Sequence, residues 1–167
     1  VFIAYSLINT YITPYSKIAL SINENQVSSI LLTLGIASLI GAKTGGKLAD
    51  RFGARRTLLS SMFIQILALL ILSLVGGVRV PTLIFLIIYE MSAWTFGPTQ
   101  NYNLVTLAPE ASGIMLSLNS SFVQMGFATG AGIGGLAISN FSVLSITIVG
   151  AFTVSTALVI RLKLKDS

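Results

Sequence analysis

The chain has 167 residues, of which 54% are hydrophobic and only 9% are charged. Soluble domains carry about a quarter charged residues, so this composition excludes a soluble globular protein and indicates one that lies in a membrane. The net charge is +5, and the absence of cysteine and histidine excludes disulfides, thiol chemistry, histidine metal sites and histidine proton relays. We expect neither a metal site nor a cofactor.

The chain starts at Val1 rather than at a methionine, and apolar residues follow at once. No basic segment or cleavage site indicates a signal peptide. We therefore expect residues 1–167 to be a single transmembrane bundle, a fragment that begins inside or just before a membrane helix.

Apolar stretches recur along the chain, and several approach the ~20 residues that cross the hydrocarbon core of a bilayer. They predict an all-α integral membrane protein with six transmembrane helices. The predicted helices are roughly Phe2–Ser16, Val27–Leu48, Thr57–Val75, Pro81–Leu104, Ile114–Ile138 and Phe141–Ile160.

The first predicted helix is unusually polar for a membrane span. Tyr5, Asn9 and Thr13 are spaced by four residues and share one face. If this face meets a cavity, Tyr5 and Asn9 can bind a polar solute. Alternatively, the face forms hydrogen bonds with other helices, or its polarity marks the boundary of the fragment.

The turn after the second predicted helix concentrates charge in an otherwise apolar chain. Gly46 should let that helix approach a neighbour closely, and Gly53 should supply a positive φ. Asp50 can accept hydrogen bonds from the N-terminus of a neighbouring helix, and the arginines can pair with Asp50 or anchor the turn at phospholipid. An ordinary basic turn would not explain the Gly-x-x-x-Asp-Arg-x-Gly spacing. We interpret these residues as a conformational latch: Gly46, Asp50, Arg51, Gly53, Arg55 and Arg56.

A carboxylate lies near the middle of the fourth predicted helix. Charged and unpaired, Glu90 would cost roughly 2.5–3.5 kcal/mol there, so we expect it to be protonated, paired or in contact with water. It is a candidate proton carrier; the alternative is a carboxylate bonded to a neighbouring helix for packing alone. Trp94 continues its face, and Pro98 should kink the helix. The candidate proton and substrate cavity comprises Tyr5, Asn9, Glu90, Trp94, Gln100, Asn101, Asn119, Ser120 and Gln124.

The fifth predicted helix has two distinct faces. Gly126, Gly130 and Gly134 repeat every four residues, which is the small-x-x-x-small pattern of closely packed helices. Ser120 and Gln124 lie on another face and can line a cavity.

Six spans place the charged turn, the Pro109 turn and the C-terminal tail on one side of the membrane, together with the N-terminus. Most cations lie on this side, including those of the Arg161–Lys165 tail, whereas the opposite side holds Lys17 and Arg79. The positive-inside rule makes the basic side cytoplasmic, and we expect the protein in the plasma membrane. Because the cations sit at helix ends, no nucleic-acid partner is expected.

The charged turn resembles the signature of the major facilitator superfamily, Gly-x-Leu-Ala-Asp-Arg-x-Gly-Arg-Arg. The match runs from Gly46 to Leu58, and Ala54 stands where the family commonly has a basic residue. Arg56 is the candidate to substitute for that missing cation.

Three further stretches are similar to the fourth and fifth helices of the C-terminal half in proton-driven efflux permeases for drugs, sugars and purines. These stretches are Trp94–Gln100, Leu107–Pro109 and Ser117–Ser121. The resemblance implies two three-helix repeats that face a missing N-terminal half across a central cavity. It supplies no acid at the position of Glu90, whose proton role rests on its place in the span.

The resemblance implies a secondary transporter that exports a small organic solute in exchange for protons by alternating access. Its partners would be the solute, protons, the lipid bilayer and the missing half. Proton-coupled uptake and a non-transporting membrane sensor or scaffold are the alternatives. An enzyme is not expected, because the chain has no histidine or cysteine and no clustered carboxylates in its spans.

Overall fold

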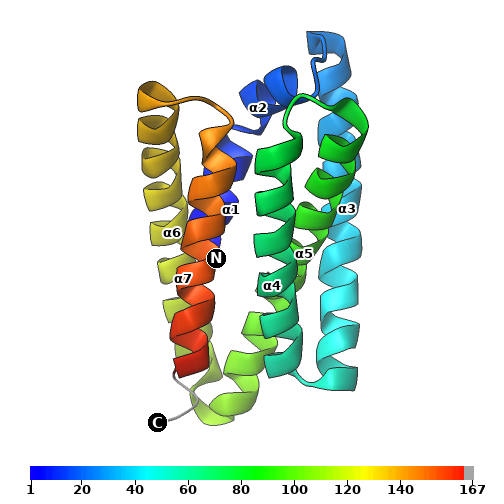
Figure 1. The fold of residues 1–167 in the computed structure, drawn as a ribbon. Coiled ribbons are helices and arrows are strands. Elements are labelled where there is room, and N and C mark those ends of the chain that lie inside the picture. The colour runs from blue at the N-terminus through cyan, green and yellow to red at the C-terminus, as the bar shows by residue number, and fades with distance from the viewer. Residues whose placement is uncertain (164–167) are drawn as a thin grey trace.

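The computed structural model describes residues 1–163, and the part of the predicted tail beyond Lys163 lies outside the described residues. Within this range the chain is helical almost throughout (Figure 1). The elements are α1 (Phe2–Thr10), α2 (Ile12–Ala19), α3 (Glu24–Phe52), α4 (Ala54–Val75), α5 (Arg79–Leu107), the 3-10 helix η1 (Pro109–Ala111), α6 (Ser112–Asn140) and α7 (Ser145–Lys163).

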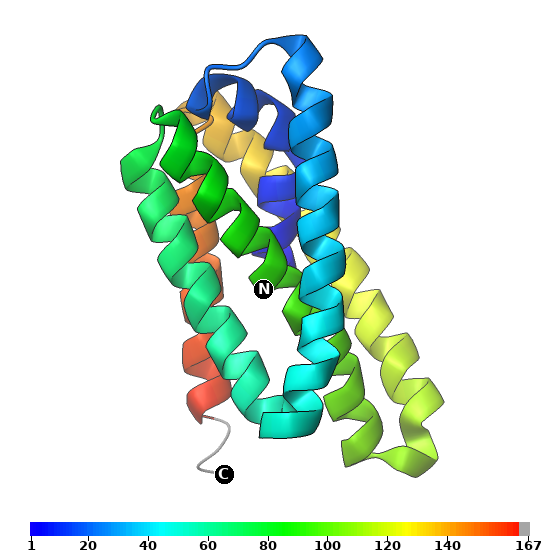
Figure 2. The ribbon, with the colours of Figure 1, turned by 90° about the vertical axis from the view of Figure 1, so that its right-hand side faces the viewer.

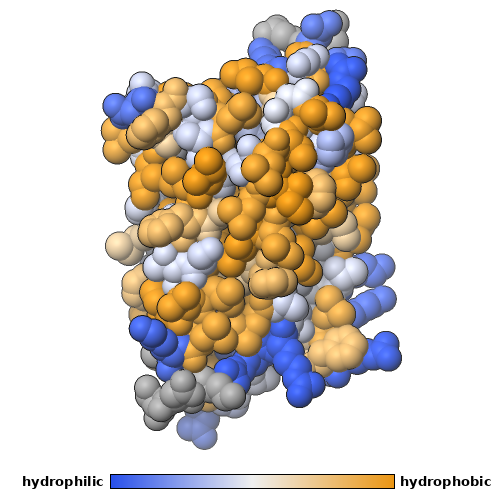
Figure 3. Space-filling view, viewed as in Figure 1, coloured by the Kyte–Doolittle hydropathy of each residue, from blue (hydrophilic) through white to orange (hydrophobic). Residues whose placement is uncertain are grey.

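Five helices of the described range are long and apolar enough to cross a membrane, namely α3 to α7. The predicted all-helical membrane class is therefore confirmed, whereas the prediction had six crossing helices. Apolar side chains cover the middle of the face seen in Figure 3, and hydrophilic ones gather at its two ends. This distribution suits a surface that meets hydrocarbon in the middle and water at both ends.

The first predicted span is where the structure differs from the sequence prediction. Instead of one helix to Ser16, the chain forms α1 with 9 residues and α2 with 8 residues, separated at Tyr11. Pro14 explains the break, because a proline has no N–H and its ring would collide with the carbonyl of Thr10 in a continuous helix. Pro14 instead lies in the first turn of α2, where its missing N–H is not needed. Figure 1 shows α2 leaning away from α1 at one end of the bundle.

The helices pack in two groups. In one group α5 lies along both α3 and α4; in the other α1 lies along α6 and also contacts α7. The two groups are joined mainly by α4 against α7, and Figures 1 and 2 show the same arrangement from two sides. The fully buried side chains that fill the core include Leu7, Leu58, Leu69, Tyr89 and Ile146.

Two glycines bring α3 against α5. A Cβ atom on Gly45 would lie 2.7 Å from the carbonyl oxygen of Thr95, and one on Gly41 would meet the backbone of Met91. The hydroxyl of Thr95 donates to the carbonyl of Gly41 at 3.0 Å. The prediction that Gly46 makes the close approach is wrong, because nothing lies within 4 Å of its Cβ position. One residue turns an α-helix by about 100°, so Gly46 points away from the seam that Gly45 forms.

The glycines of α6 face α1. Cβ atoms at Gly126 and Gly130 would lie 3.2 Å from the Cβ of Phe2 and 2.9 Å from the Cβ of Ser6, respectively. At Gly134 the nearest atoms belong to the ring of Tyr11. This seam holds α1 at a fixed height and rotation, and so decides which of its side chains face α5.

Both ends of the bundle are closed by short connections. The α3–α4 connection, η1 and the end of α7 lie at one end, and α2 and the α4–α5 turn lie at the other (Figure 1). The predicted grouping of the charged turn, the Pro109 turn and the start of the tail therefore holds for the described residues. Val1 lies about half way along the bundle rather than at either end (Figure 1).

Candidate functional site

A polar cluster joins α1 to α5 in the interior. The carboxylate of Glu90, whose side chain is only 5% exposed, accepts hydrogen bonds from two residues of α1. The hydroxyl of Tyr5 donates to Oε1 at 3.4 Å, and Nδ2 of Asn9 donates to Oε2 at 3.4 Å. The indole N–H of Trp94 lies 2.9 Å from both Oε1 of Glu90 and the hydroxyl oxygen of Tyr5. Four of the nine predicted cavity residues thus form one cluster.

Helical spacing explains why the two side chains that each helix contributes lie on the same face. Tyr5 and Asn9 are four residues apart on α1, and Glu90 and Trp94 are four residues apart on α5, so each pair shares one face of its helix. Nothing in the described residues supplies a cation to Glu90, because all three of its donors are neutral. The carboxylate is therefore held by exchangeable hydrogen bonds rather than by an ion pair.

Aromatic rings surround this cluster. The rings of Tyr5 and Trp94 meet edge to face with centroids 5.9 Å apart, and the ring of Phe127 on α6 lies 5.9 Å from that of Tyr5. Phe2 extends the group, with its centroid 6.0 Å from Phe127 and 5.8 Å from Phe96. These contacts link α1, α5 and α6 in one aromatic wall.

Two clefts flank the wall. One, of about 420 Å³, is lined by Tyr5, Ser6, Asn9, Thr10, Phe127 and Ala131. The other, of about 270 Å³, is lined by Phe2, Trp94, Gly97, Asn101, Ser120, Val123, Gln124 and Phe127. Six predicted cavity residues line one or other of these two clefts, whereas Glu90 is in the lining of neither. A solute in either cleft would meet amide, hydroxyl and aromatic groups before it reached the carboxylate.

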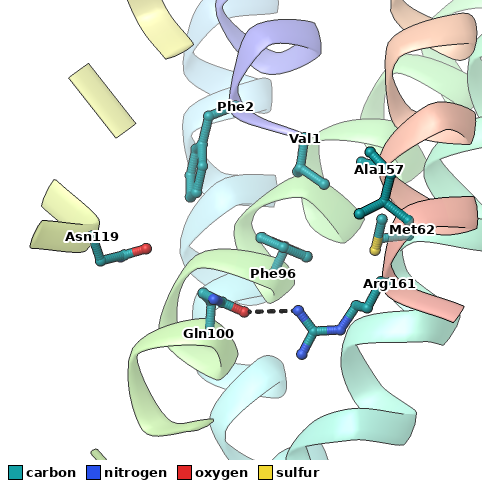
Figure 4. Close-up of a pocket in the computed structure, with 9 residues that line it drawn as sticks. Val1, Phe2, Met62, Phe96, Gln100, Asn119, Ala157 and Arg161 are labelled. Atoms are coloured by element: carbon teal, nitrogen blue, oxygen red, sulfur yellow. Dashed lines mark hydrogen bonds between the residues drawn. The ribbon is translucent and has the colours of Figure 1, made fainter. Parts of the chain in front are cut away.

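The other two predicted cavity residues, Gln100 and Asn119, lie apart from this cluster. They line a separate cavity of about 340 Å³, which is also lined by Val1 and by Phe2, the first residue of α1 (Figure 4). There a guanidinium N–H of Arg161 donates to Oε1 of Gln100 at 3.2 Å, which ties the end of α7 to α5 (Figure 4). Asn119 donates to Asn101 at 2.9 Å and so links α6 to α5.

The expected role of Arg161 was limited to setting the membrane orientation through its charge. The structure turns its side chain toward the bundle instead, where it is partly buried. The signal was present in the sequence, because Arg161 lies at helical spacing from the inward-facing Val154 and Ala157.

Arg79 is a second residue whose role was missed. Its guanidinium donates to the carbonyl oxygens of Leu20 and Ser21, both at 3.1 Å. It therefore binds the orphan carbonyls at the end of α2 and fixes that helix to the start of α5. The break at Pro14 was the feature of the sequence that could have indicated a side chain binding the end of α2.

The predicted latch is not a loop. α3 continues to Phe52 and α4 begins at Ala54, so one residue, Gly53, separates the two helices. Gly53 has φ 85° and ψ 147°, and its predicted positive φ is confirmed. The motif therefore consists of two helix ends joined at a single glycine.

The charged side chains of the latch are exposed in the structure. Asp50, Arg51, Arg55 and Arg56 all point to the surface, and no hydrogen bond or ion pair joins Asp50 to an arginine within residues 1–163. Of the alternatives for the arginines, pairing with Asp50 is therefore not present in the described part of the bundle. The guanidinium of Arg51 lies 5.3 Å from the centroid of the Phe52 ring, which is a cation–π distance.

Comparison with known proteins identifies relatives along the whole chain. The sequence profile described as Major Facilitator Superfamily matches residues 1–167. A Bacillus subtilis (strain 168) protein named "Uncharacterized MFS-type transporter YbcL" is 43% identical over 163 residues, which cover 98% of this chain and 42% of the relative. The chain thus spans less than half the length of this curated relative.

Proposed function

The chain belongs to the major facilitator superfamily, and on that premise we propose that its protein exports a small organic solute in exchange for protons. The solute would bind between this bundle and a second six-helix half, and the two halves would rock about the site so that it opens to one side at a time. The protein would lie in the plasma membrane with the α3–α4 connection on the cytoplasmic side.

The observation that carries the proposal is the Glu90 cluster. Glu90 is buried on a membrane-spanning helix and has three neutral donors and no cationic partner among the described residues. A carboxylate in this setting can take up and release a proton without breaking an ion pair. Two clefts beside it offer polar and aromatic groups to a solute.

Exchange requires that the solute and the proton exclude each other from the site. If each binds only when the other has left, a proton gradient drives solute out, and the affinity of each is lowered by the other to the same degree. One carboxylate that serves both is the simplest arrangement with this property. Proton-coupled uptake would require the opposite, namely that the two bind together.

The test uses the protein made from its complete gene, in inverted membrane vesicles whose interior is acidic. A pH-sensitive dye reports the pH difference across the vesicle membrane. Candidate solutes that the protein exports should release protons from the vesicles, and Glu90→Gln should reduce this release by at least about tenfold. Glu110→Gln is the matched control, because Glu110 is an exposed carboxylate on η1.

Each result has one meaning. Parental proton release by Glu90→Gln would remove Glu90 as the carrier. A solute-dependent proton movement of opposite sign would indicate uptake. No solute-dependent proton movement with any solute tested would favour a non-transporting sensor or scaffold on the same fold.

A further inference from the structure

The charge of the Glu90 cluster is unbalanced. All three donors to its carboxylate are neutral, and no lysine or arginine within the described range acts on it. The other ionisable groups close enough to influence Glu90 are the phenols of Tyr5 on α1 and Tyr89 on α5; α3, α4 and α6 bring it no charged group among residues 1–163. An ionised carboxylate that is buried without a cationic partner strongly attracts a cation that enters the site.

Two of its donors are held weakly. The bonds from Tyr5 and Asn9 are both 3.4 Å long, beyond the usual range of roughly 2.7–3.2 Å, whereas the bond from Trp94 is 2.9 Å. Tyr5 and Asn9 also line the larger of the two clefts. A stronger donor that arrives through this cleft can therefore replace them at Glu90.

The aromatic side chains beside Glu90 are also suited to bind a cationic group. Tyr5, Trp94 and Phe127 form a connected aromatic surface, and Trp94 is 41% exposed. The face of an aromatic ring attracts a cation within about 6 Å, most strongly where water is excluded. Carboxylate and aromatic rings together are complementary to a positively charged, partly apolar molecule.

We propose that the solute is an organic cation whose ammonium or related cationic group binds the Glu90 carboxylate and whose apolar body lies against Tyr5, Trp94 and Phe127. This inference rests on the proposed proton exchange and names its substrate class. A cation and a proton neutralise the same carboxylate, so each displaces the other without any further coupling device. One proton then enters for each monovalent cation that leaves, and no net charge crosses the membrane.

The binding test uses the purified protein from the complete gene and three cations of increasing size: choline, tetraethylammonium and tetraphenylphosphonium. Tetraphenylborate, an anion with the shape of tetraphenylphosphonium, is the matched probe. We expect at least one cation to bind with release of a proton, and the anion not to bind. Glu90→Gln should weaken cation binding by about tenfold or more, Glu90→Asp should retain part of it, and Glu110→Gln should leave it unchanged.

Two substitutions of Tyr5 separate the contribution of its ring to cation binding from that of its hydroxyl group. Tyr5→Phe keeps a ring and should bind the cation within about threefold of the parent, whereas Tyr5→Leu should bind it more weakly. Equal binding of tetraphenylborate, binding by none of the three cations, or parental affinity in a folded Glu90→Gln protein would overturn the proposal.

Transport in proteoliposomes tests the charge balance. Exchange of the bound cation should follow the pH gradient and should be unaffected by a potential imposed with potassium and valinomycin. Acceleration by that potential would contradict the one-for-one exchange. If a neutral solute is exported with protons but no cation binds, the cation proposal fails and the exchange stands. If cations bind at Glu90 but are not exchanged across the membrane, the cation site stands and the proposed transport fails.

Discussion

The hydrogen bonding of Glu90 changes when its carboxylate takes up a proton. The ionised group can only accept, and it accepts from Tyr5, Asn9 and Trp94. The protonated group carries an O–H donor and has less acceptor capacity, so its bond with the Tyr5 hydroxyl can reverse, whereas the indole N–H of Trp94 can only donate. Proton binding would thus alter the contact between α1 and α5 at the same atoms where a solute would bind.

At Gly53 the absence of a Cβ atom permits the backbone conformation that joins α3 to α4. Its φ of 85° with ψ of 147° is a conformation that is essentially limited to glycine. We expect Gly53→Ala to destabilise the protein by about 1–3 kcal/mol, which a lowered thermal midpoint of the purified protein would report.

The control for this change is Gly46→Ala, seven residues earlier on α3. Gly46 lies within the helix and has no heavy atom within 4 Å of its Cβ position. Alanine there should be neutral or stabilising by up to ~1 kcal/mol. Equal effects of the two substitutions would show that the conformation at Gly53 is not a constraint.

At the scale of helices, two glycine seams place the site. Gly41 and Gly45 bring α3 against α5, which carries Glu90, and Gly130 and Gly134 bring α6 against α1, which carries Tyr5. Direct packing between α1 and α5 is slight by comparison. The cluster is therefore assembled by two helices that are each positioned by a different neighbour.

The first seam predicts a difference between two glycines of α3. Gly45→Ala would force its Cβ to within 2.7 Å of the carbonyl oxygen of Thr95, so one helix must shift, at a cost of about 1–3 kcal/mol. Gly35→Ala, which has no atom within 4 Å of the new Cβ, should not lower the thermal midpoint. If Gly45→Ala is as stable as Gly35→Ala, the seam is looser than the structure indicates.

The sequence predicts which residues share one face of a helix, but it does not predict which faces of different helices are in contact. Spacing by four residues paired Tyr5 with Asn9 and Glu90 with Trp94, because helical periodicity is a local property. That these two pairs meet depends on the relative rotation of α1 and α5, which distant glycines determine. For the same reason Gly46 was chosen over Gly45, since the motif shows the spacing of glycines but not which one faces a neighbour.

Other differences have local causes that could have been read from the sequence. Pro14 divides the first predicted span, and the helical spacing of Arg161 turns it inward. The final predicted helix begins at Ser145 rather than Phe141, and the Ser145 hydroxyl donates to the carbonyl of Ser142 in the preceding turn. Contacts with groups outside the chain, including any that Asp50 makes, cannot be predicted from the local sequence.

At the scale of the whole molecule, the exposed charges of the α3–α4 connection are free to bind outside this bundle. The side chain of Asp50 has no hydrogen bond or ion pair among residues 1–163, and the α3–α4 connection lies at the end of the bundle opposite α2 (Figure 1). We propose that Asp50 binds the other half of the transporter in one of the two access states and so holds that state closed.

This latch predicts that Asp50→Asn slows transport without unfolding the protein. Loss of a charge-assisted contact of ~1.4 kcal/mol would change the rate by about tenfold, measured as solute flux in vesicles. Thermal midpoint and size-exclusion profile should match those of the parent, and Glu110→Gln should transport normally. Parental flux in Asp50→Asn would eliminate the latch.

The hydrogen bond from Trp94 has an optical consequence. The chain contains a single tryptophan, and its indole N–H lies 2.9 Å from the Glu90 carboxylate and 2.9 Å from the Tyr5 hydroxyl. Indole fluorescence responds to the charge and polarity around the ring. The tryptophan emission of this chain therefore originates entirely from the candidate site, and the molecule carries its own spectroscopic reporter of what occupies that site.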